Sequence, residues 1–291
     1  MTGPATDGAT SPRRAGCHAS AVFSSDEAWA DHVFRFLRQG LERGERLHYF
    51  ADSTPPGTVT DMLSRRGLDV RAARERGQLT VMTAQEAYLA SGGFDPDTMV
   101  EQWHTAVASA VREGYAGLRA VGEMSWYGRG VRAAERLLEY ELRIHEEVFA
   151  RLPLTALCLY DRRLLPEDDV AVLAGAHLVR MDAGQEPVPS PVLRVAPLPD
   201  RPGLRLAGDA NADSHRTVEG TVAVLSRLCR EGAELDLSQL EHIDAAGAAR
   251  LASVATRAPG GRLAVLDPPP SLTRLMGLFP EMGAALEVTS R

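Results

Sequence analysis

The chain has 291 residues, and its 32 basic and 39 acidic residues give a formal charge of −7 at pH 7. Every basic residue is an arginine, which excludes Schiff-base and phosphate-loop lysines, and the acidic balance argues against broad attraction to nucleic acid or to an anionic membrane. The length exceeds what one hydrophobic core usually serves, so two domains are expected.

Residues 1–15 are rich in Gly, Pro, Ser and Thr and lack the apolar core of a signal peptide, so we expect a disordered leader there. Cys17, Cys158 and Cys229 are odd in number and have no C-x-x-C spacing, which is typical of a reducing compartment. No stretch approaches the apolar length that a spanning helix requires. We therefore expect a cytoplasmic protein that does not enter the membrane.

Residues 16–181 show strand patterns that alternate with helical patterns. Strands are expected at 18–24, 46–52, 79–84, 117–124 and 155–161, and helices at 26–44, 58–67, 95–114 and 131–151. Several of the strands are apolar on both faces, which is typical of a parallel sheet covered by helices. The pattern predicts an α/β domain with a mainly parallel sheet.

A proline-rich stretch at residues 182–202 separates this region from the next, and we expect a linker with room for one strand. Residues 203–291 repeat the alternation on a smaller scale. Strands are expected at 204–210, 233–240 and 261–268, and helices at 217–232, 245–258 and 270–280. This segment is predicted to be a second, small α/β domain.

The second segment contains the run ELDLSQLEHIDAAGAARL at 234–251, a strand and a turn whose Asp244 is placed to cap the following helix. The run resembles the STAS domain of anti-sigma factor antagonists over about residues 203–289. In that family a partner anti-sigma factor kinase phosphorylates the serine after the turn aspartate. Here that position is Ala245, followed by Ala246, and neither accepts a phosphate.

The resemblance implies a partner surface on the STAS-like domain that lacks the usual phosphoserine switch. Its expected members are Ser238, Asp244, Ala245, Ala246 and Gly247. The simpler interpretation of Asp244 is a helix cap alone, and Ser238 is placed to hydrogen-bond locally. The expected partner is an anti-sigma factor kinase or a similar regulator, and a homo-oligomer stays open.

Polar and aromatic residues lie at strand ends of the first segment. The motifs are His18 in the first strand, GLRAVGEMSW at 117–126, LLEYE at 137–141, LCLYD at 157–161, and His177. Their order resembles the MEDS domain, a sensory domain named from methanogen and methylotroph proteins and from a dichloromethane-responsive repressor. The resemblance covers about residues 16–181. It implies a non-catalytic sensor of small molecules, proposed for hydrocarbon derivatives, with a RecA-like fold that lacks the phosphate loop.

Carried over by motif, the expected ligand-binding residues are His18, Arg119, Glu123, Trp126, Glu139, Tyr160 and His177, and Glu141 and Cys158 also match the motifs. Ligands of open α/β sheets usually sit beyond the carboxyl ends of the strands. A pair of Arg119 and Glu123 would bind a polar head there, while Trp126 and Tyr160 would wall an apolar part. The alternative for Arg119 and Glu123 is a buried structural ion pair.

Other function classes have weaker support in the sequence. It contains no nucleophile elbow, glycine-rich phosphate loop or metal-ligand spacing, so we expect no enzyme, catalytic residue, cofactor or metal. The alternatives are an enzyme or nucleotide-binding protein using the first domain, a scaffold without a ligand, and a metal or haem sensor. The metal alternative would use His18, Cys17, Cys158 and His177, because first and last strands are often neighbours in space.

Overall fold

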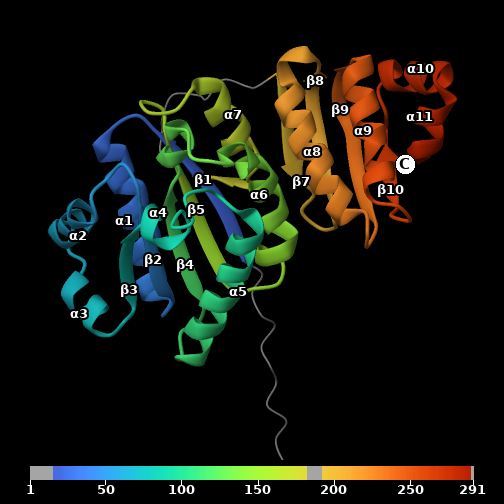
Figure 1. Cartoon of the computed structure of the whole chain (residues 1–291). Helices are drawn as coiled ribbons and strands as arrows, with labels where there is room; N and C mark the ends of the chain where they lie inside the picture. Colours follow the sequence, from blue (N-terminus) through green and yellow to red (C-terminus); the bar gives the residue numbers. More distant parts are fainter. Residues whose placement is uncertain (1–15, 182–191, 290–291) are drawn as a thin grey trace, which may run out of the picture.

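Alternating strands and amphipathic helices form two α/β units, each built on its own sheet, in a computed structural model that describes residues 16–181 and 192–289 (Figure 1). The expected leader and residues 182–191 of the expected linker lie outside the described residues. Within the described ranges, none of the helices combines the length and the apolar character needed to cross a bilayer.

The first sheet is parallel and, in the described part of the chain, has six strands in the order β3-β2-β4-β5-β1-β6. Its strands are β1 (Cys17–Phe23), β2 (Arg46–Ala51), β3 (Leu79–Thr83), β4 (Leu118–Glu123), β5 (Leu154–Asp161) and β6 (Val179–Arg180). Its helices are α1 (Asp26–Glu42), α2 (Pro56–Arg65), α3 (Val70–Glu75), α4 (Ala84–Ala87), α5 (Pro96–Arg112), α6 (Leu137–Ile144) and α7 (Glu167–Gly175).

The helices cover both faces of this sheet, as the doubly apolar strands require. Helices α1, α2 and α3 pack on one face with Val121 and Leu157. Helices α5, α6 and α7 pack on the other face with Ala120 and Cys158. Neighbouring residues of β4 and β5 thus enter opposite cores, which is the alternation expected of a strand.

The second sheet is smaller and mixed. Among the described residues it has five strands in the order β11-β10-β9-β8-β7, and only the pair β7 and β8 is antiparallel. The strands are β7 (Leu193–Pro197), β8 (Gly203–Ala210), β9 (Ala233–Ile243), β10 (Leu263–Leu266) and β11 (Glu287–Thr289), and the helices are α8 (His215–Leu228), α9 (Ala245–Arg257), α10 (Pro270–Leu278) and α11 (Pro280–Ala285). Strand β7 lies within the stretch expected as linker and belongs to this sheet.

The two units share one apolar core. Helix α6 packs against α8, and α7 packs against β7 (Figure 1). Gly220 in α8 allows the close approach, because a Cβ there would lie 3.1 Å from Leu138 Cδ2. A single cluster of buried side chains runs from the α5–α7 face of the first sheet into the second unit.

The long helix expected at 131–151 is divided. Ala133 adopts a left-handed conformation with φ 62°, which an alanine adopts only at an energetic cost. After Ala133 the chain forms three separate pieces: a 3-10 turn at Ala134–Arg136, helix α6, and a π-helical turn at His145–Phe149. Such π turns are frequent at functional sites, and this one places Phe149 beside His18.

Candidate functional site

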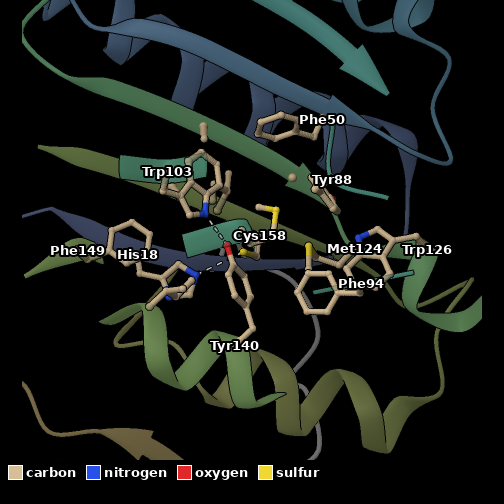
Figure 2. A pocket seen from close by; sticks show the side chains of 16 residues that line it. His18, Phe50, Tyr88, Phe94, Trp103, Met124, Trp126, Tyr140, Phe149 and Cys158 are labelled. Atoms are coloured by element: carbon tan, nitrogen blue, oxygen red, sulfur yellow. Dashed lines mark hydrogen bonds between the residues drawn. The ribbon is translucent and has the colours of Figure 1, made fainter. Parts of the chain in front are cut away.

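A small aromatic cavity, lined mostly by buried side chains, lies against the α5–α7 face of the first sheet (Figure 2). Its volume is about 40 Å³, whereas one water requires roughly 10–15 Å³. The lining is almost entirely apolar and comprises His18, Phe50, Tyr88, Phe94, Met99, Trp103, Ala120, Gly122, Met124, Trp126, Tyr140, Ile144, Phe149, Ala156, Leu157 and Cys158. It suits a molecule of a few heavy atoms.

Small residues on the strands leave the space that the aromatic rings line. Ala120, Gly122 and Met124 alternate along β4 toward the cavity. Opposite them, the rings of Phe94 and Trp126 lie 4.9 Å apart between centroids. The cavity therefore lies along the sheet face, and not beyond the carboxyl ends of the strands as the sequence predicted.

Two indole groups differ in how their N–H groups are used. Trp103 Nε1 donates to Tyr140 Oη at 2.6 Å. Trp126 Nε1 is buried near Tyr88, yet it reaches no acceptor in normal hydrogen-bond geometry among the described residues. A bound molecule with an acceptor atom would satisfy the Trp126 donor.

A polar cluster borders the cavity at its His18 side. It comprises His18, Glu141, Cys158 and His177, which are all buried, with one nitrogen, oxygen or sulfur atom from each within 4.8 Å of the others. His18 Nε2 lies 3.1 Å from Glu141 Oε2 and 3.5 Å from Cys158 Sγ. Glu141 Oε2 also lies 3.5 Å from His177 Nε2 and 3.9 Å from Cys158 Sγ.

The tautomer of His177 is set by the backbone of α7. Its Nδ1 lies 3.0 Å from the carbonyl oxygen of Leu173, so Nδ1 carries the proton and donates. Burial, and secondly repulsion from the protonated form of nearby His18, lowers the pKa of His177 to about 3. His177 is thus neutral at physiological pH, and its Nε2 presents a lone pair to the cluster.

The other cluster members also favour their neutral forms. Burial, followed by His145, lowers the pKa of His18 to about 3. Burial raises the pKa of Glu141, and burial together with Glu141 raises the pKa of Cys158 well above that of a free thiol. The contacts of Glu141 with the two histidines are therefore not ordinary ion pairs, since both imidazoles are uncharged.

Glu123 lies on the opposite face of the sheet and is saturated by the protein itself. Its carboxylate accepts hydrogen bonds from Tyr49 Oη at 2.6 Å and from the backbone N–H groups of Asp52 at 2.8 Å and Thr54 at 2.9 Å. These bonds hold the turn between β2 and α2. Glu123 is not part of the cavity lining.

Arg119 does not pair with Glu123. Its Nε donates to Glu45 Oε2 at 2.5 Å, and its guanidinium lies 4.5 Å from the ring centroid of Phe36. The two residues point to one face but are four residues apart on a strand, which separates them by roughly 13 Å. The expected pair for a polar ligand head is therefore absent among the described contacts.

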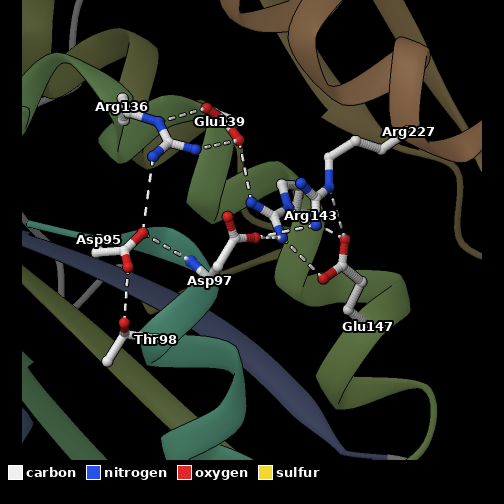
Figure 3. Close-up of polar contacts among 8 residues, drawn as sticks. All are labelled: Asp95, Asp97, Thr98, Arg136, Glu139, Arg143, Glu147 and Arg227. Atoms are coloured by element: carbon white, nitrogen blue, oxygen red, sulfur yellow. Dashed lines mark hydrogen bonds and ion pairs between the residues drawn. The ribbon is translucent and has the colours of Figure 1, made fainter. Parts of the chain in front are cut away.

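Glu139 is not part of the cavity lining, and its carboxylate accepts hydrogen bonds from Arg136 and Arg143 (Figure 3). Arg143, buried between the domains, donates to Glu139 at 3.0 Å, Asp97 at 2.7 Å and Glu147 at 3.0 Å. Arg227 of α8 reaches the same Asp97 at 3.0 Å. One face of α6 thus contacts the polar cluster through Glu141, while another contacts the second domain.

The turn between β9 and α9 shows a cap and an exposed pair of alanines. Asp244 caps α9 by accepting from Gly247 N at 2.7 Å, and Ala245 and Ala246 are exposed at the first turn. Ser238 donates to Asp236 Oδ1 at 2.6 Å. Ser238, which lies within β9, therefore makes the local hydrogen bond that the sequence predicts.

The groove at the carboxyl ends of the first sheet has both acidic and basic side chains, namely Asp26, Glu27, Asp161, Arg65, Arg66 and Arg163. Only Ser24 and Ser25 separate β1 from α1, and Ser25 caps the helix. Asp26 and Glu27 occupy the first helical turn. Carboxylates at this helix N-terminus occupy the position that favours an anion, and Asp26 is paired there with Arg163 at 2.8 Å.

Of the expected ligand residues, His18 and Trp126 line the cavity, and Tyr160 and His177 belong to or border the polar cluster. The aromatic walls from β2, α5 and the loops were not foreseen. The sequence motifs predict Glu139 as the ligand residue, whereas the structure places Glu141 in the cluster, because Glu141 falls in the apolar stripe of α6 with Leu137 and Ile144. That helical spacing was the available signal.

Comparison with known families gives two matches. Residues 17–178 match the family described as MEthanogen/methylotroph, DcmR Sensory domain (MEDS). Residues 193–280 match the family described as Mlab, STAS domain. The fold and these matches define a regulatory protein that joins a sensory domain to an STAS domain. Because the first match covers more than half of its length, the chain belongs to the MEDS family.

The N-terminal part is similar to the transcriptional repressor DcmR of Methylorubrum extorquens. The two are 28% identical over 162 residues, which is 55% of this chain and 57% of that repressor, so little more than half of the relative is matched. A KaiC-like protein of Pyrococcus horikoshii OT3 matches with 12% identity and a TM-score of 0.37, over 52% of this chain and 65% of that structure.

Proposed function

We propose that the first domain senses a small hydrocarbon derivative in the aromatic cavity and that the STAS domain passes the response to a protein regulator. The aromatic cavity beside His18 and Cys158 carries this proposal, because it is apolar, lined mostly by buried side chains and matched in size to a molecule of a few heavy atoms. Sensing is assigned to residues 16–181, and output to residues 203–291 together with β7.

Helix α6 offers a direct connection between the two functions. Tyr140 and Ile144 line the cavity. Leu138 packs against Gly220 of α8, and Arg143 binds Asp97 and Glu147, which Arg227 of α8 also contacts. A ligand shifts an equilibrium only by its differential affinity for two states. A ligand that favours one position of α6 would therefore also favour one arrangement of the STAS domain.

The proposed output surface is the exposed turn that includes Ala245 and Ala246. The expected partner is an anti-sigma factor or a related regulator. Without a phosphoserine, control would come from the sensory domain in place of a kinase. The protein is placed in the cytoplasm, a proposal supported by the free thiols of Cys17, Cys158 and Cys229.

The cavity can be tested with xenon first and with dichloromethane and methanol as hydrocarbon derivatives. Trp103 and Trp126 line the cavity, so their fluorescence should change on binding. A Cβ at Gly122 would meet only Met124 Sδ, at 3.6 Å, so Gly122→Ala should fill part of the cavity without disturbing the fold. We expect it to weaken binding at least tenfold.

Gly57→Ala is the matched control, because a Cβ at Gly57 has nothing within 4 Å and Gly57 lies in α2, on the other face of the sheet. Binding to this variant should equal binding to the unaltered chain. Saturable binding that is equally strong in both variants would place the ligand elsewhere. The proposal would then be wrong for this cavity.

A further inference from the structure

We infer that His18, Glu141, Cys158 and His177 form a binding site for a divalent transition metal ion, with Zn²⁺ as the ion that the ligand set suits best. The set supplies two imidazole nitrogens, one carboxylate oxygen and one sulfur, each a common ligand of Zn²⁺. The inference is independent of the proposed small-molecule ligand.

The distances fit a four-coordinate ion. Zn²⁺ binds N, O and S atoms at about 2.0–2.3 Å, which places tetrahedral ligands roughly 3.3–3.7 Å apart. The separations from His18 Nε2 to Glu141 and Cys158 are 3.1 and 3.5 Å, and those from Glu141 Oε2 to His177 and Cys158 are 3.5 and 3.9 Å. The two remaining pairs, which both include His177, lie within 4.8 Å, so a movement of the His177 side chain toward the other three ligands would complete the geometry.

The orientation of His177 is that of a metal ligand. Its Nδ1 donates to the Leu173 carbonyl, the second interaction that commonly orients a ligating histidine. Its Nε2 is fully buried and has no hydrogen-bond partner among the described residues. This lone pair faces a carboxylate oxygen, an arrangement that a cation between the two atoms would stabilise.

The charges also balance. A bound Zn²⁺ would be neutralised by the carboxylate of Glu141 and by the thiolate of Cys158 after its proton is released to solvent. The buried site would then carry no net charge, which avoids the large cost of burying an unpaired ion. Tyr160 Oη, which donates to Glu141 Oε1 at 3.1 Å, would hold the carboxylate in place.

The sequence placed Cys17 with these residues in its metal alternative, and the structure excludes Cys17 from the cluster. Cys17 directly precedes His18 in β1, so its side chain points to the opposite face of the sheet. It lines a separate groove with Arg119 and Glu45. Glu141 takes the place of the fourth ligand.

The test measures metal in the full chain, expressed in minimal medium with added zinc or, separately, cobalt. We expect one metal ion per chain by elemental analysis, and the cobalt protein should show a thiolate-to-cobalt charge-transfer absorption. Folded protein with substoichiometric metal after both preparations would overturn the inference. Bound cobalt without the thiolate absorption would do the same, because the ion would then lie elsewhere.

Variants of the cysteines locate the ion. Cys158→Ser should remove the charge-transfer absorption and lower affinity by more than 100-fold, beyond the loss typical of an outer-shell change. Cys229→Ser is the matched control, since Cys229 is also a buried free thiol but lies in the second domain. Unchanged absorption in Cys158→Ser would contradict the site.

A milder variant keeps the test informative if Cys158→Ser does not fold. Tyr160→Phe removes only the hydroxyl that orients Glu141, so the absorption should persist while affinity for cobalt falls about 10- to 100-fold. An unchanged cobalt affinity in Tyr160→Phe, together with an unchanged stoichiometry in His177→Gln, would also overturn the inference.

Discussion

The two faces of the first sheet each bury a glutamate, and their surroundings differ. Glu123 accepts hydrogen bonds from a tyrosine and two backbone N–H groups, so donors of the protein itself satisfy both carboxylate oxygens. Glu141 faces a neutral histidine lone pair and a thiol with a raised pKa. A buried carboxylate surrounded by donors is structural, whereas one surrounded by other ligand atoms indicates a site for an added cation.

The same substitution at both positions should separate the two roles. In Glu123→Gln the amide can keep its oxygen toward the N–H groups of Asp52 and Thr54 only by turning its N–H₂ toward Tyr49 Oη, whose hydroxyl then loses its acceptor. Leaving a buried donor unpaired costs about 1–3 kcal/mol, so we expect a loss of stability of about that size. Chemical denaturation followed by tryptophan fluorescence measures this, because Trp29, Trp103 and Trp126 all lie in the first domain. A loss below about 1 kcal/mol would contradict the structural role of Glu123.

A substitution of Arg143 tests whether a buried charged group near the domain boundary has a structural role or also transmits a response to the second domain (Figure 3). Its guanidinium binds Asp97, Glu139 and Glu147 while almost fully buried. Arg143→Gln should cost about 2 kcal/mol, as charge-assisted hydrogen bonds are lost, and should weaken the response of the STAS domain to cavity ligands. Hydrogen exchange of α8 with and without ligand measures the response. A full response in this variant would remove Arg143 from the coupling.

Glu141→Gln should behave in the opposite way to Glu123→Gln. The amide N–H₂ can donate to the free Nε2 of His177, so the metal-free protein should keep its stability within about 1 kcal/mol or gain up to that amount. The same fluorescence-detected denaturation, with a chelator present, measures it. A loss as large as that of Glu123→Gln would show that both carboxylates are structural and would end the comparison.

Ala245→Asp is expected to have the smallest effect on stability. A carboxylate in the first turn of α9 interacts favourably with the helix dipole, by about 0.3–1 kcal/mol. The charge should nevertheless lower affinity for the regulator if the turn is the contact surface. Calorimetric titration with a candidate anti-sigma factor, using the exposed Arg257→Ala at the far end of α9 as control, distinguishes the outcomes. Equal affinity in both would exclude the turn.

The sequence predicted the fold better than the site. The expected strands and most helices have physical signals in the chain, namely apolar runs, periodicity and caps such as Ser25 and Asp244. The family resemblances, confirmed over residues 17–178 and 193–280, also depended on local motifs. Short elements such as α7 and β11 have weak periodicity and were missed.

The cavity could not be predicted, because such a space depends on how distant rings meet. Phe50, Phe94 and Trp103 come from different elements, and nothing in their local sequence fixes their separation. The sequence did contain the information needed to exclude a pair between Arg119 and Glu123. Their shared face was predictable from alternation, but the rise along a strand already places them too far apart to pair.

Helix α6 has a thermodynamic consequence for any cell that contains this protein. The helix contacts the cavity on one face and the second domain on another, so any coupling between a proposed cavity ligand and a proposed partner of the second domain would be reciprocal. A regulator that binds the ligand-favoured arrangement would raise the affinity of the protein for the ligand. The factor would equal that by which the ligand raises the affinity for the regulator. The threshold concentration for the small molecule would then depend on how much regulator is present.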